Sequence, residues 1–427
     1  IIAAAALPLL VGSAGLATDT IQWALWKRQL QRAADSAAIA GAYDRANNDG
    51  QTGTTSTAVN HDLTLNQHTG MSLESGYPKI TYPSDTADNL NQVKVQLAVQ
   101  RKLSFSGLFM KNPPLIVTTA TAASVEGTAE FCIVSLETSG SKTGIAVIGN
   151  AGIDADCSFM SNAASPNSAF AKGSSEVNAE AIVAVGGIQE SSNWNVDSYQ
   201  PYAPPLDDPF ANVTPSPSDM KCAGHSEPQG NGSKWVSDVL DENTNFDNSK
   251  DANGNKANCF SSLSVGANQT LTLPDGTYYI NGGDAFIQGT ISCGACTIVL
   301  TNTSTSSSAT IGTFKVNATA NINLNAPTSG TYKGIAIYQD RRAKDTNNAN
   351  MINGNSNSTI NGAVYFPNQE LNYNGTGTTS ATCTLLVAKR LVFSGNSSTS
   401  NKWKKADQCA AYGMPTLTGG RRIRLVA

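Results

Sequence analysis

Three patterns of hydrophobic and polar positions follow one another along the chain, and the first is an uncharged stretch. Residues Ile1–Ala17 are all apolar or small, a length at the lower edge of the roughly 17–25 residues that span a bilayer. Trp23 and Trp26 follow, then Arg28, which is typical of an aromatic belt with a basic flank. Pro8 should bend such a helix without excluding it, because membrane helices tolerate proline. This stretch predicts a transmembrane anchor.

The helical pattern continues beyond the uncharged stretch. Between Ile21 and Ala40, apolar and small residues recur about every 3.6 positions. Asn47–Gly50 is a strong stop signal, so we expect one helix over residues 1–50 that starts in the membrane and projects from it. A cleaved signal peptide would lose its helical pattern after a small-residue cleavage site. We therefore expect the anchor to be retained.

The second pattern, over residues 51–128, indicates a small α+β unit. Residues 92–100 alternate between apolar and polar side chains, as a half-buried strand does. Residues 105–109 suggest a short amphipathic turn, and residues 115–123 read as a second strand. We expect these elements to pack against the projecting helix.

The third pattern fills residues 129–427 and makes the protein mainly β. Short alternating runs, such as 144–150, 311–316 and 359–366, are separated by Gly, Asn and Ser, and helical periodicity is absent. Both a β-sandwich and a solenoid of stacked short strands fit this pattern. Frequent Gly-Asn turns and low charge favour the solenoid, so we predict a right-handed parallel β-helix.

Length and charge exclude some classes of protein. The 427 residues exceed one ordinary domain. Only 14% are charged and 40% are hydrophobic, which is unlike a disordered tail. The net charge of -4, with no sustained basic patch, gives no reason to expect a nucleic-acid partner. His61, His68 and His225 are scattered, so a metal site built from histidines is not expected.

The cysteines indicate an oxidising compartment. All eight lie at or after position 132, and an even number suits disulfides. They are Cys132, Cys157, Cys222, Cys259, Cys293, Cys296, Cys383 and Cys409. Chain order suggests that neighbours pair, although eight cysteines allow 105 pairings and sequence alone does not choose among them. The single CxxC has no βαβ pattern around it and no second CxxC, so a local disulfide is favoured over redox chemistry or zinc.

One segment carries a family resemblance. The sequence GLATDTIQWALWKRQLQRAADSAAIAGA, residues 15–42, resembles the N-terminal signature of TadG-like proteins of bacterial Tad (tight adherence, Flp) pilus systems. The matching positions are Gly15, Leu16, Ala17, Asp19, Trp23, Arg28, Gln29, Leu30, Gln31, Ala33, Ala34, Asp35, Ala37 and Ala38. Ala5 stands where a main pilin subunit would carry Glu, which argues against a major subunit.

The resemblance extends more loosely along the chain. Residues 149–157, 205–211 and 422–426 look like segments of long TadG-related proteins. It implies that the unit over 51–128 is pilin-like and that the helix contacts other pilus subunits and the inner membrane. It also implies that the bulk is periplasmic, or extracellular in the pilus.

The first candidate site is an assembly surface on the helix, formed by Asp19, Trp23, Trp26 and Arg28. Ionisable residues beside an apolar segment cost free energy and often face a partner. Asp19 is also explained as a solvated helix position, and the sequence leaves both interpretations open. For Asp35 the solvated interpretation is favoured.

The second candidate is a calcium site. Oxygen-bearing side chains recur at alternate positions, and Gly254 follows them. They are Asp241, Asn243, Asn245, Asp247, Asp251 and Asn253. The glycine is misplaced for an EF-hand loop, and Asp and Asn are common turn-formers, so turns are favoured over calcium. Apart from this candidate calcium ion, no cofactor is expected.

The third candidate is an aromatic contact surface on a long loop excursion at about 188–235, where we see no strand pattern. It carries Trp194, Tyr199, Tyr202 and Trp235. Long loops are often functional, and exposed aromatic residues make binding surfaces. The alternative is a loop lying flat on the solenoid with its aromatic side chains turned inward.

Catalytic motifs are not found. Ser139–Lys142 fits SxxK and Lys142–Gly144 fits KTG, but the two share one lysine and penicillin-recognising enzymes need two. Asp340–Lys344 resembles a catalytic group only by analogy with β-helix lyases. We expect a non-enzymatic Tad/Flp pilus component: a minor, tip-located subunit or an assembly factor that presents its β-helix for adhesion or capping. The alternatives are a membrane-anchored glycan- or envelope-binding protein and a carbohydrate-active enzyme.

Overall fold

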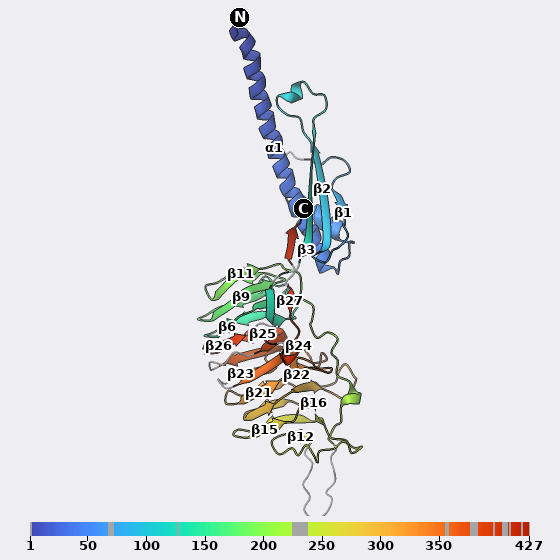
Figure 1. Ribbon diagram of the computed structural model, residues 1–427, viewed down its shortest axis with the longest axis vertical. Helices are drawn as coiled ribbons and strands as arrows, with labels where there is room; N and C mark the ends of the chain where they lie inside the picture. Colours follow the sequence, from blue (N-terminus) through green and yellow to red (C-terminus); the bar gives the residue numbers. More distant parts are fainter. Residues whose placement is uncertain are drawn as a thin grey trace, which may run out of the picture. The chain divides into compact units, whose positions relative to one another are not determined.

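The computed structural model divides the chain into two units (Figure 1). The helical unit comprises Ile1–Gly127 and Arg421–Ala427, and the parallel-strand unit comprises Thr128–Gly420. The structure describes residues 2–66, 72–125, 127, 129–223, 238–354, 358–375, 383–395, 398–403, 409, 411–419 and 422–426. For 2–10, 354, 375 and 398–403 it describes the backbone alone.

The helical unit packs two helices on an antiparallel sheet. The helices are α1 (Ile2–Asn47) and α2 (Thr55–Leu65). The sheet has the order β1 (Lys79–Thr81), β2 (Asn89–Gln100), β3 (Leu115–Val125) and β28 (Arg422–Leu425). A short 3-10 turn, η1 (Ser106–Leu108), lies between β2 and β3. The predicted helix and both predicted strands are therefore present.

Small residues on α1 let the helix approach the sheet closely. Ala34 and Ala38 are fully buried against Val93 and Val95 in one hydrophobic core. At Gly41 an added Cβ would lie 2.9 Å from side-chain atoms of α2 and β2, so only glycine fits there. The predicted domains 1–50 and 51–128 thus share a single core.

Among the described residues, no helix is both long and apolar enough to cross a membrane. The side chains of residues 2–10, which form most of the predicted transmembrane stretch, lie outside the part that the structure describes.

Most strands of the parallel-strand unit are short, and the longest, Thr359–Gly375, has 17 residues. In chain order they are β4 (Ala129–Ser135), β5 (Ile145–Val147), β6 (Gly152–Ala155), β7 (Ser158–Ser161), β8 (Ala169–Ala171), β9 (Glu176–Ala184), β10 (Ile188–Gln189), β11 (Trp194–Gln200), β12 (Val239–Leu240), β13 (Cys259–Phe260), β14 (Ser262–Val265), β15 (Thr270–Leu273), β16 (Gly276–Asn281), β17 (Ala285–Ile287), β18 (Thr290–Cys293), β19 (Cys296–Thr301), β20 (Phe314–Val316), β21 (Asn321–Asn325), β22 (Ile335–Gln339), β23 (Asn350–Gly354), β24 (Thr359–Gly375), β25 (Thr384–Phe393), β26 (Ser398–Trp403) and β27 (Thr418–Gly419). A second 3-10 turn is η2 (Pro217–Asp219).

Most strands in this unit pair in parallel with a strand two or three places further along the chain, whereas β27 pairs antiparallel with β4. Thus β13 pairs with β16, β16 with β19, and β19 with β22, while β14, β17, β20 and β23 form a second series. A third series runs β15, β18, β21 and β24. Three successive strands therefore make one layer, and the layers stack (Figure 1). Alternate side chains point inward and form a continuous core that includes Ile298, Phe314 and Ile322.

The order of layers in the stack differs from their order in the chain. The chain enters at β4, and β7 to β11 extend the stack from there in one direction. The layers from β12 onward begin at the opposite end and build back, until β25 pairs with β4 and β5. The first and last layers of this unit are therefore neighbours inside the stack.

A segment that we call the strap, residues 201–223, connects the two ends of the stack (Figure 1). Near its start the Ala203 N–H donates to Ala184 O in β9. Further along, Asn162 donates to Leu206 O at 2.7 Å. At its end Cys222 is joined to Cys259 in β13. The strap therefore runs along the outside of the layers.

Two predicted boundaries need correction. The predicted excursion at 188–235 contains β10 and β11, which complete the last layer at one end of the stack, so the excursion begins only at residue 201. The predicted third domain ran to residue 427, whereas β28 pairs with β3 in the helical unit. The parallel-strand unit is therefore inserted between two adjacent strands of the helical unit.

The four disulfides join cysteines that are neighbours in chain order, as suggested by the sequence. The pairs are Cys132–Cys157, Cys222–Cys259, Cys293–Cys296 and Cys383–Cys409.

Candidate assembly site on the N-terminal helix

The loop between β2 and β3, residues 101–114, lies along the first half of α1 (Figure 1). The Arg101 guanidinium stacks over the Trp26 ring at 4.6 Å from its centroid. The Ser104 hydroxyl donates to Gln22 Oε1 at 3.0 Å. Because Arg101 meets residue 26 and Ser104 meets residue 22, the loop runs towards the N-terminal end of the helix.

Gly15 and Asp19, one helical turn apart, hold this loop. The Phe105 ring lies so close to Gly15 that an added Cβ there would be 2.3 Å from Phe105 Cγ. The Asp19 carboxylate accepts the backbone N–H groups of Phe105 at 2.8 Å and Ser106 at 2.5 Å. These donors are at the start of η1, where backbone N–H groups lack helical partners.

Asp19 is consequently buried, with a 4% exposed fraction. Burial alone would raise its pKa, but the hydrogen bonds from Ser106 and Phe105 hold the pKa below the ordinary aspartate value. The carboxylate thus acts as a charged cap within its own chain. The solvated interpretation of Asp19 is wrong.

The other predicted assembly residues differ in exposure. Trp23 is 37% exposed, and the Lys27 ammonium lies 5.2 Å from the centroid of its ring. Arg28 is exposed and Trp26 is half-buried. Of the predicted set, Trp23 and Arg28 remain available to a partner.

Large apolar side chains are exposed on the loop and on α1. The tip of the loop exposes Leu108 and Phe109 by 77% and 76% and Met110 by 45%. On α1, large apolar side chains are also exposed: Val11, Leu16, Ile21 and Leu25. The sequence indicated only a short amphipathic turn over residues 105–109, whereas in the structure Phe105 packs on the helix and the tip of the loop is exposed.

The predicted aromatic contact surface is not an exposed cluster. Trp194 is 5% exposed, and its indole N–H donates to Gln189 O at 3.1 Å. Tyr199 packs against the interior core. Tyr202 is 64% exposed, and Trp235 lies outside the described residues. Trp194 is buried because β11 is a strand whose alternate side chains point inward, which corrects the prediction for this residue.

The predicted calcium residues close local turns. Each of three side-chain oxygens accepts the backbone N–H two positions further on: Asp241 from Asn243 at 3.0 Å, Asn245 from Asp247 at 3.1 Å and Asp251 from Asn253 at 2.9 Å. Across the ranges that the structure describes, no three His, Cys, Asp or Glu side chains are grouped to hold a metal ion. Calcium binding stays a prediction.

Strap contacts form a polar network on the outer face of the stack. Arg341 donates to the Asp208 carboxylate at 2.9 Å and to Val213 O at 2.7 Å. The Tyr365 hydroxyl donates to the same carboxylate at 2.6 Å, and the Tyr338 hydroxyl donates to Val213 O at 2.7 Å. These bonds fix the strap on β22 and β24.

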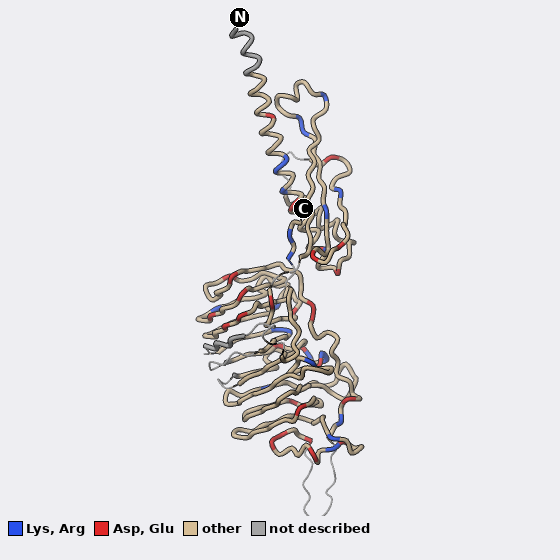
Figure 2. The backbone as a smooth tube through the Cα atoms, viewed as in Figure 1, with Lys and Arg blue, Asp and Glu red and all other residues tan. Residues whose placement is uncertain are grey.

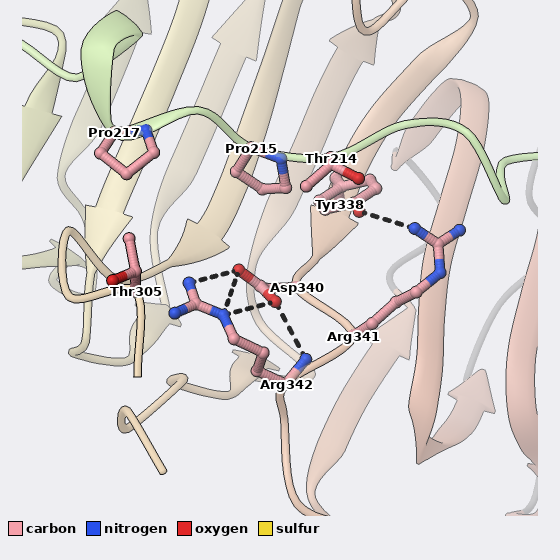
Figure 3. Close-up of a pocket in the computed structure, with 8 residues that line it drawn as sticks. All are labelled: Thr214, Pro215, Pro217, Thr305, Tyr338, Asp340, Arg341 and Arg342. Atoms are coloured by element: carbon pink, nitrogen blue, oxygen red, sulfur yellow. Dashed lines mark hydrogen bonds and ion pairs between the residues drawn. The ribbon is translucent and has the colours of Figure 1, made fainter. Parts of the chain in front are cut away.

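A cavity of about 350 Å³ lies beside the strap (Figure 3). Its lining comprises Thr214, Pro215, Pro217, Thr305, Tyr338, Asp340, Arg341 and Arg342. Asp340 and Arg342 pair at 2.7 Å. Burial alone would raise the pKa of Asp340, but hydrogen bonds from Arg342 and Thr301 hold that pKa below its ordinary value. Asp340, Arg341 and Arg342, three of the charged residues considered for catalysis, are therefore paired within the protein.

Residues 1–45 match the family described as "Putative Flp pilus-assembly TadE/G-like", so the N-terminus carries a TadE/G-like Flp pilus-assembly domain. This match supports a pilus-related component at the cell envelope or outside the cell. No curated protein matches the chain. Among solved structures, the chain is similar to the competence-associated pilin ComZ from Thermus thermophilus, with 10% sequence identity. That comparison covers 84% of this chain and 87% of the other, with a TM-score of 0.31, too low to carry an argument about the fold.

Proposed function

We propose that the chain is a non-enzymatic minor component of a Tad/Flp pilus, a tip-located subunit or an assembly factor. The observation that carries the proposal is the family match over residues 1–45. Its α1 would contact other pilus subunits and the inner membrane. The bulk would lie in the periplasm or outside the cell in the pilus.

The large unit would be a right-handed parallel β-helix used for adhesion or capping. Parallel pairing in three series of strands, around one apolar core, supports this assignment. Insertion of the whole unit between β3 and β28 leaves α1 and its sheet complete. A subunit of this kind keeps its assembly helix intact and carries the parallel-strand unit as a separate domain.

The non-enzymatic role is supported by the cavity beside the strap. A glycosidase general acid needs a raised pKa, whereas Asp340 is held ionised by Arg342. The second candidate function, a membrane-anchored glycan- or envelope-binding protein, is favoured by the cavity itself, because Pro215, Pro217 and Tyr338 line it beside polar groups.

The deciding experiment is to shear surface fibres from intact cells and probe fibre and membrane fractions with an antibody to the parallel-strand unit. Sparse signal at one end of the fibres by immunogold is the expected result. Signal in the membranes alone excludes the fibre subunit and leaves an assembly factor or an envelope-binding protein.

Variants of α1 sharpen this test. The double substitution Trp23→Ala, Arg28→Ala removes the two exposed predicted assembly side chains and should deplete the protein from fibres. Lys94→Ala, an exposed position on β2 of the same unit, is the matched control and should leave the fibre signal unchanged. Equal fibre signal from both variants would show that these α1 residues do not contribute to assembly.

A further inference from the structure

The loop 101–114 has an exposed apolar tip that is held in place. Phe109 packs edge-on against Phe105 with centroids 5.5 Å apart. Phe105 in turn lies on Gly15, and its N–H is bound by Asp19. The loop is thus tied to α1 by its base, while Leu108 and Phe109 remain about three-quarters exposed. Fixed exposed apolar groups of this kind mark a contact with another molecule or a membrane.

Basic residues lie on the loop and on the part of α1 beside its base. Segments 11–32 and 101–114, which lie side by side, contain six basic residues and a single acidic residue, in a chain whose net charge is -4. The basic residues are Lys27, Arg28, Arg32, Arg101, Lys102 and Lys111. The acidic residue is Asp19, whose carboxylate is already used by two backbone N–H groups. Figure 2 shows basic residues on both the loop and this part of the helix.

The loop also lies beside the end of the uncharged stretch. Phe105 contacts Gly15, two residues before Ala17, where that stretch ends. If residues 1–17 enter a bilayer, the loop is held at the boundary between hydrocarbon and headgroups. Apolar side chains flanked by Lys or Arg are suited to that boundary, because the apolar groups enter the acyl region while the cations meet anionic headgroups.

We propose that the loop 101–114 is a second membrane contact: Leu108, Phe109 and Met110 enter an anionic bilayer beside α1, and Lys102 and Lys111 bind its headgroups. This inference rests on the membrane anchor in the proposed function. The loop fixes how the helix is tilted and rotated at the surface, since two contacts restrain it where one would not.

The test places a photoreactive benzophenone amino acid at position 109 in the full chain. The protein is reconstituted into vesicles of phosphatidylcholine with phosphatidylglycerol, irradiated and analysed by mass spectrometry for lipid adducts. The matched control carries the same group in place of Phe286, which is 42% exposed on β17 of the other unit. Lipid adducts at position 109 and none at position 286 are the expected result.

Charge dependence provides the second readout. Each basic side chain near an anionic surface contributes roughly a fivefold gain in binding. Lys102→Gln with Lys111→Gln should therefore lower the adduct yield by up to roughly 25-fold on vesicles containing phosphatidylglycerol. On vesicles of phosphatidylcholine alone the same double variant should give the same yield as the parent.

The outcomes separate this inference from the proposed function. Protein that floats with the vesicles but gives no lipid adduct at position 109, or cross-links there to a second copy, overturns the loop contact alone. Protein that does not float overturns both the anchor and the loop contact. Failure of the pilus assignment is seen independently, as absence from sheared fibres.

Discussion

Replacing Arg390 with Met should destabilise the parallel-strand unit more than any exposed ion pair could. The Arg390 guanidinium is 6% exposed and contacts three carboxylates: Glu137 at 2.8 Å, Asp345 at 2.5 Å and Glu370 at 3.4 Å. Glu137 and Glu370 are 4% and 11% exposed. Met fills similar space, but it leaves these carboxylates without their buried counter-charge.

The expected cost follows from burial. Removing one partner of a buried ion pair costs about 3–5 kcal/mol, which lowers the melting temperature by roughly 10 °C in a unit of this size. The matched control is Lys256→Met, which breaks an ion pair of similar length, 2.9 Å, whose side chains are 71% and 86% exposed. Solvent screens that pair, so its loss should cost less than about 1 kcal/mol.

The pH dependence of the stability difference between the parent and Arg390→Met tests whether the loss is electrostatic. Hydrogen bonding to Arg390 lowers the pKa of Asp345. Burial alone would raise the pKa of Glu137, but hydrogen bonds from Arg390 and the Ser139 N–H, together with the positive charges of Lys389 and Arg390, hold that pKa below its ordinary value. A lowered folded-state pKa stabilises the protein above the unfolded value, about 4, and this contribution is lost as the pH falls through the folded value. The difference between the parent and Arg390→Met should therefore be largest at neutral pH and shrink below pH of about 4.

Urea denaturation followed by far-ultraviolet circular dichroism, at neutral and acidic pH, measures this difference. A loss below about 1 kcal/mol at neutral pH, equal to that of the exposed pair, would refute the buried-charge argument. A large loss that stays constant with pH would assign the effect to packing alone. In the double variant Glu137→Gln, Arg390→Met, part of the lost stability should return, because one uncompensated carboxylate is removed.

Three other predictions concern separate features. Asp19→Ala should release the 101–114 loop and speed hydrogen exchange at the Phe105 amide, while unchanged exchange would mean that packing on α1 alone holds the loop. Replacing both Cys222 and Cys259 with Ser removes a disulfide between residues 37 positions apart. This change should lower the free energy of unfolding, measured in urea, by about 4 kcal/mol, because the unfolded chain gains conformational entropy. A loss under about 1 kcal/mol would contradict that explanation. Tyr338→Phe removes one hydrogen bond to the strap and should cost about 1 kcal/mol and speed proteolytic cleavage there, whereas parent-like cleavage would show that the bond does not hold the strap.

Patterns among residues close together in the sequence predicted part of the structure. The apolar rhythm of α1 and the alternation in residues 92–100 predicted elements that are present. Pairing of neighbouring cysteines matched all four disulfides because each pair joins segments at most 37 residues apart. These features depend on residues that are close in the chain, which is the information that a single sequence contains.

Contacts between distant residues were not predictable in the same way. The Ser135 hydroxyl in β4 donates to Lys389 O in β25, 254 positions away, and no local pattern marks that pairing. Trp194 was misassigned because the turn residues before β11 hide a strand of seven residues. The basic residues near the loop tip lie in two segments about seventy positions apart, so no patch is visible until the fold brings them together.

The strap links two lengths, the height of the stack and the length of the segment that connects its ends. In a solenoid whose layers follow the order of the chain, no such segment is needed. Each added layer lengthens a stack by about 4.8 Å, and an extended residue covers about 3.3 Å. In a relative with one more layer the strap would therefore have to span about 4.8 Å more, either with one or two added residues or by straightening a turn such as η2. Duplication of a layer would move Cys259 away from the part of the strap that β22 and β24 hold, so growth of this unit during evolution is coupled to an adjustment of the strap, which is encoded at a separate place in the gene.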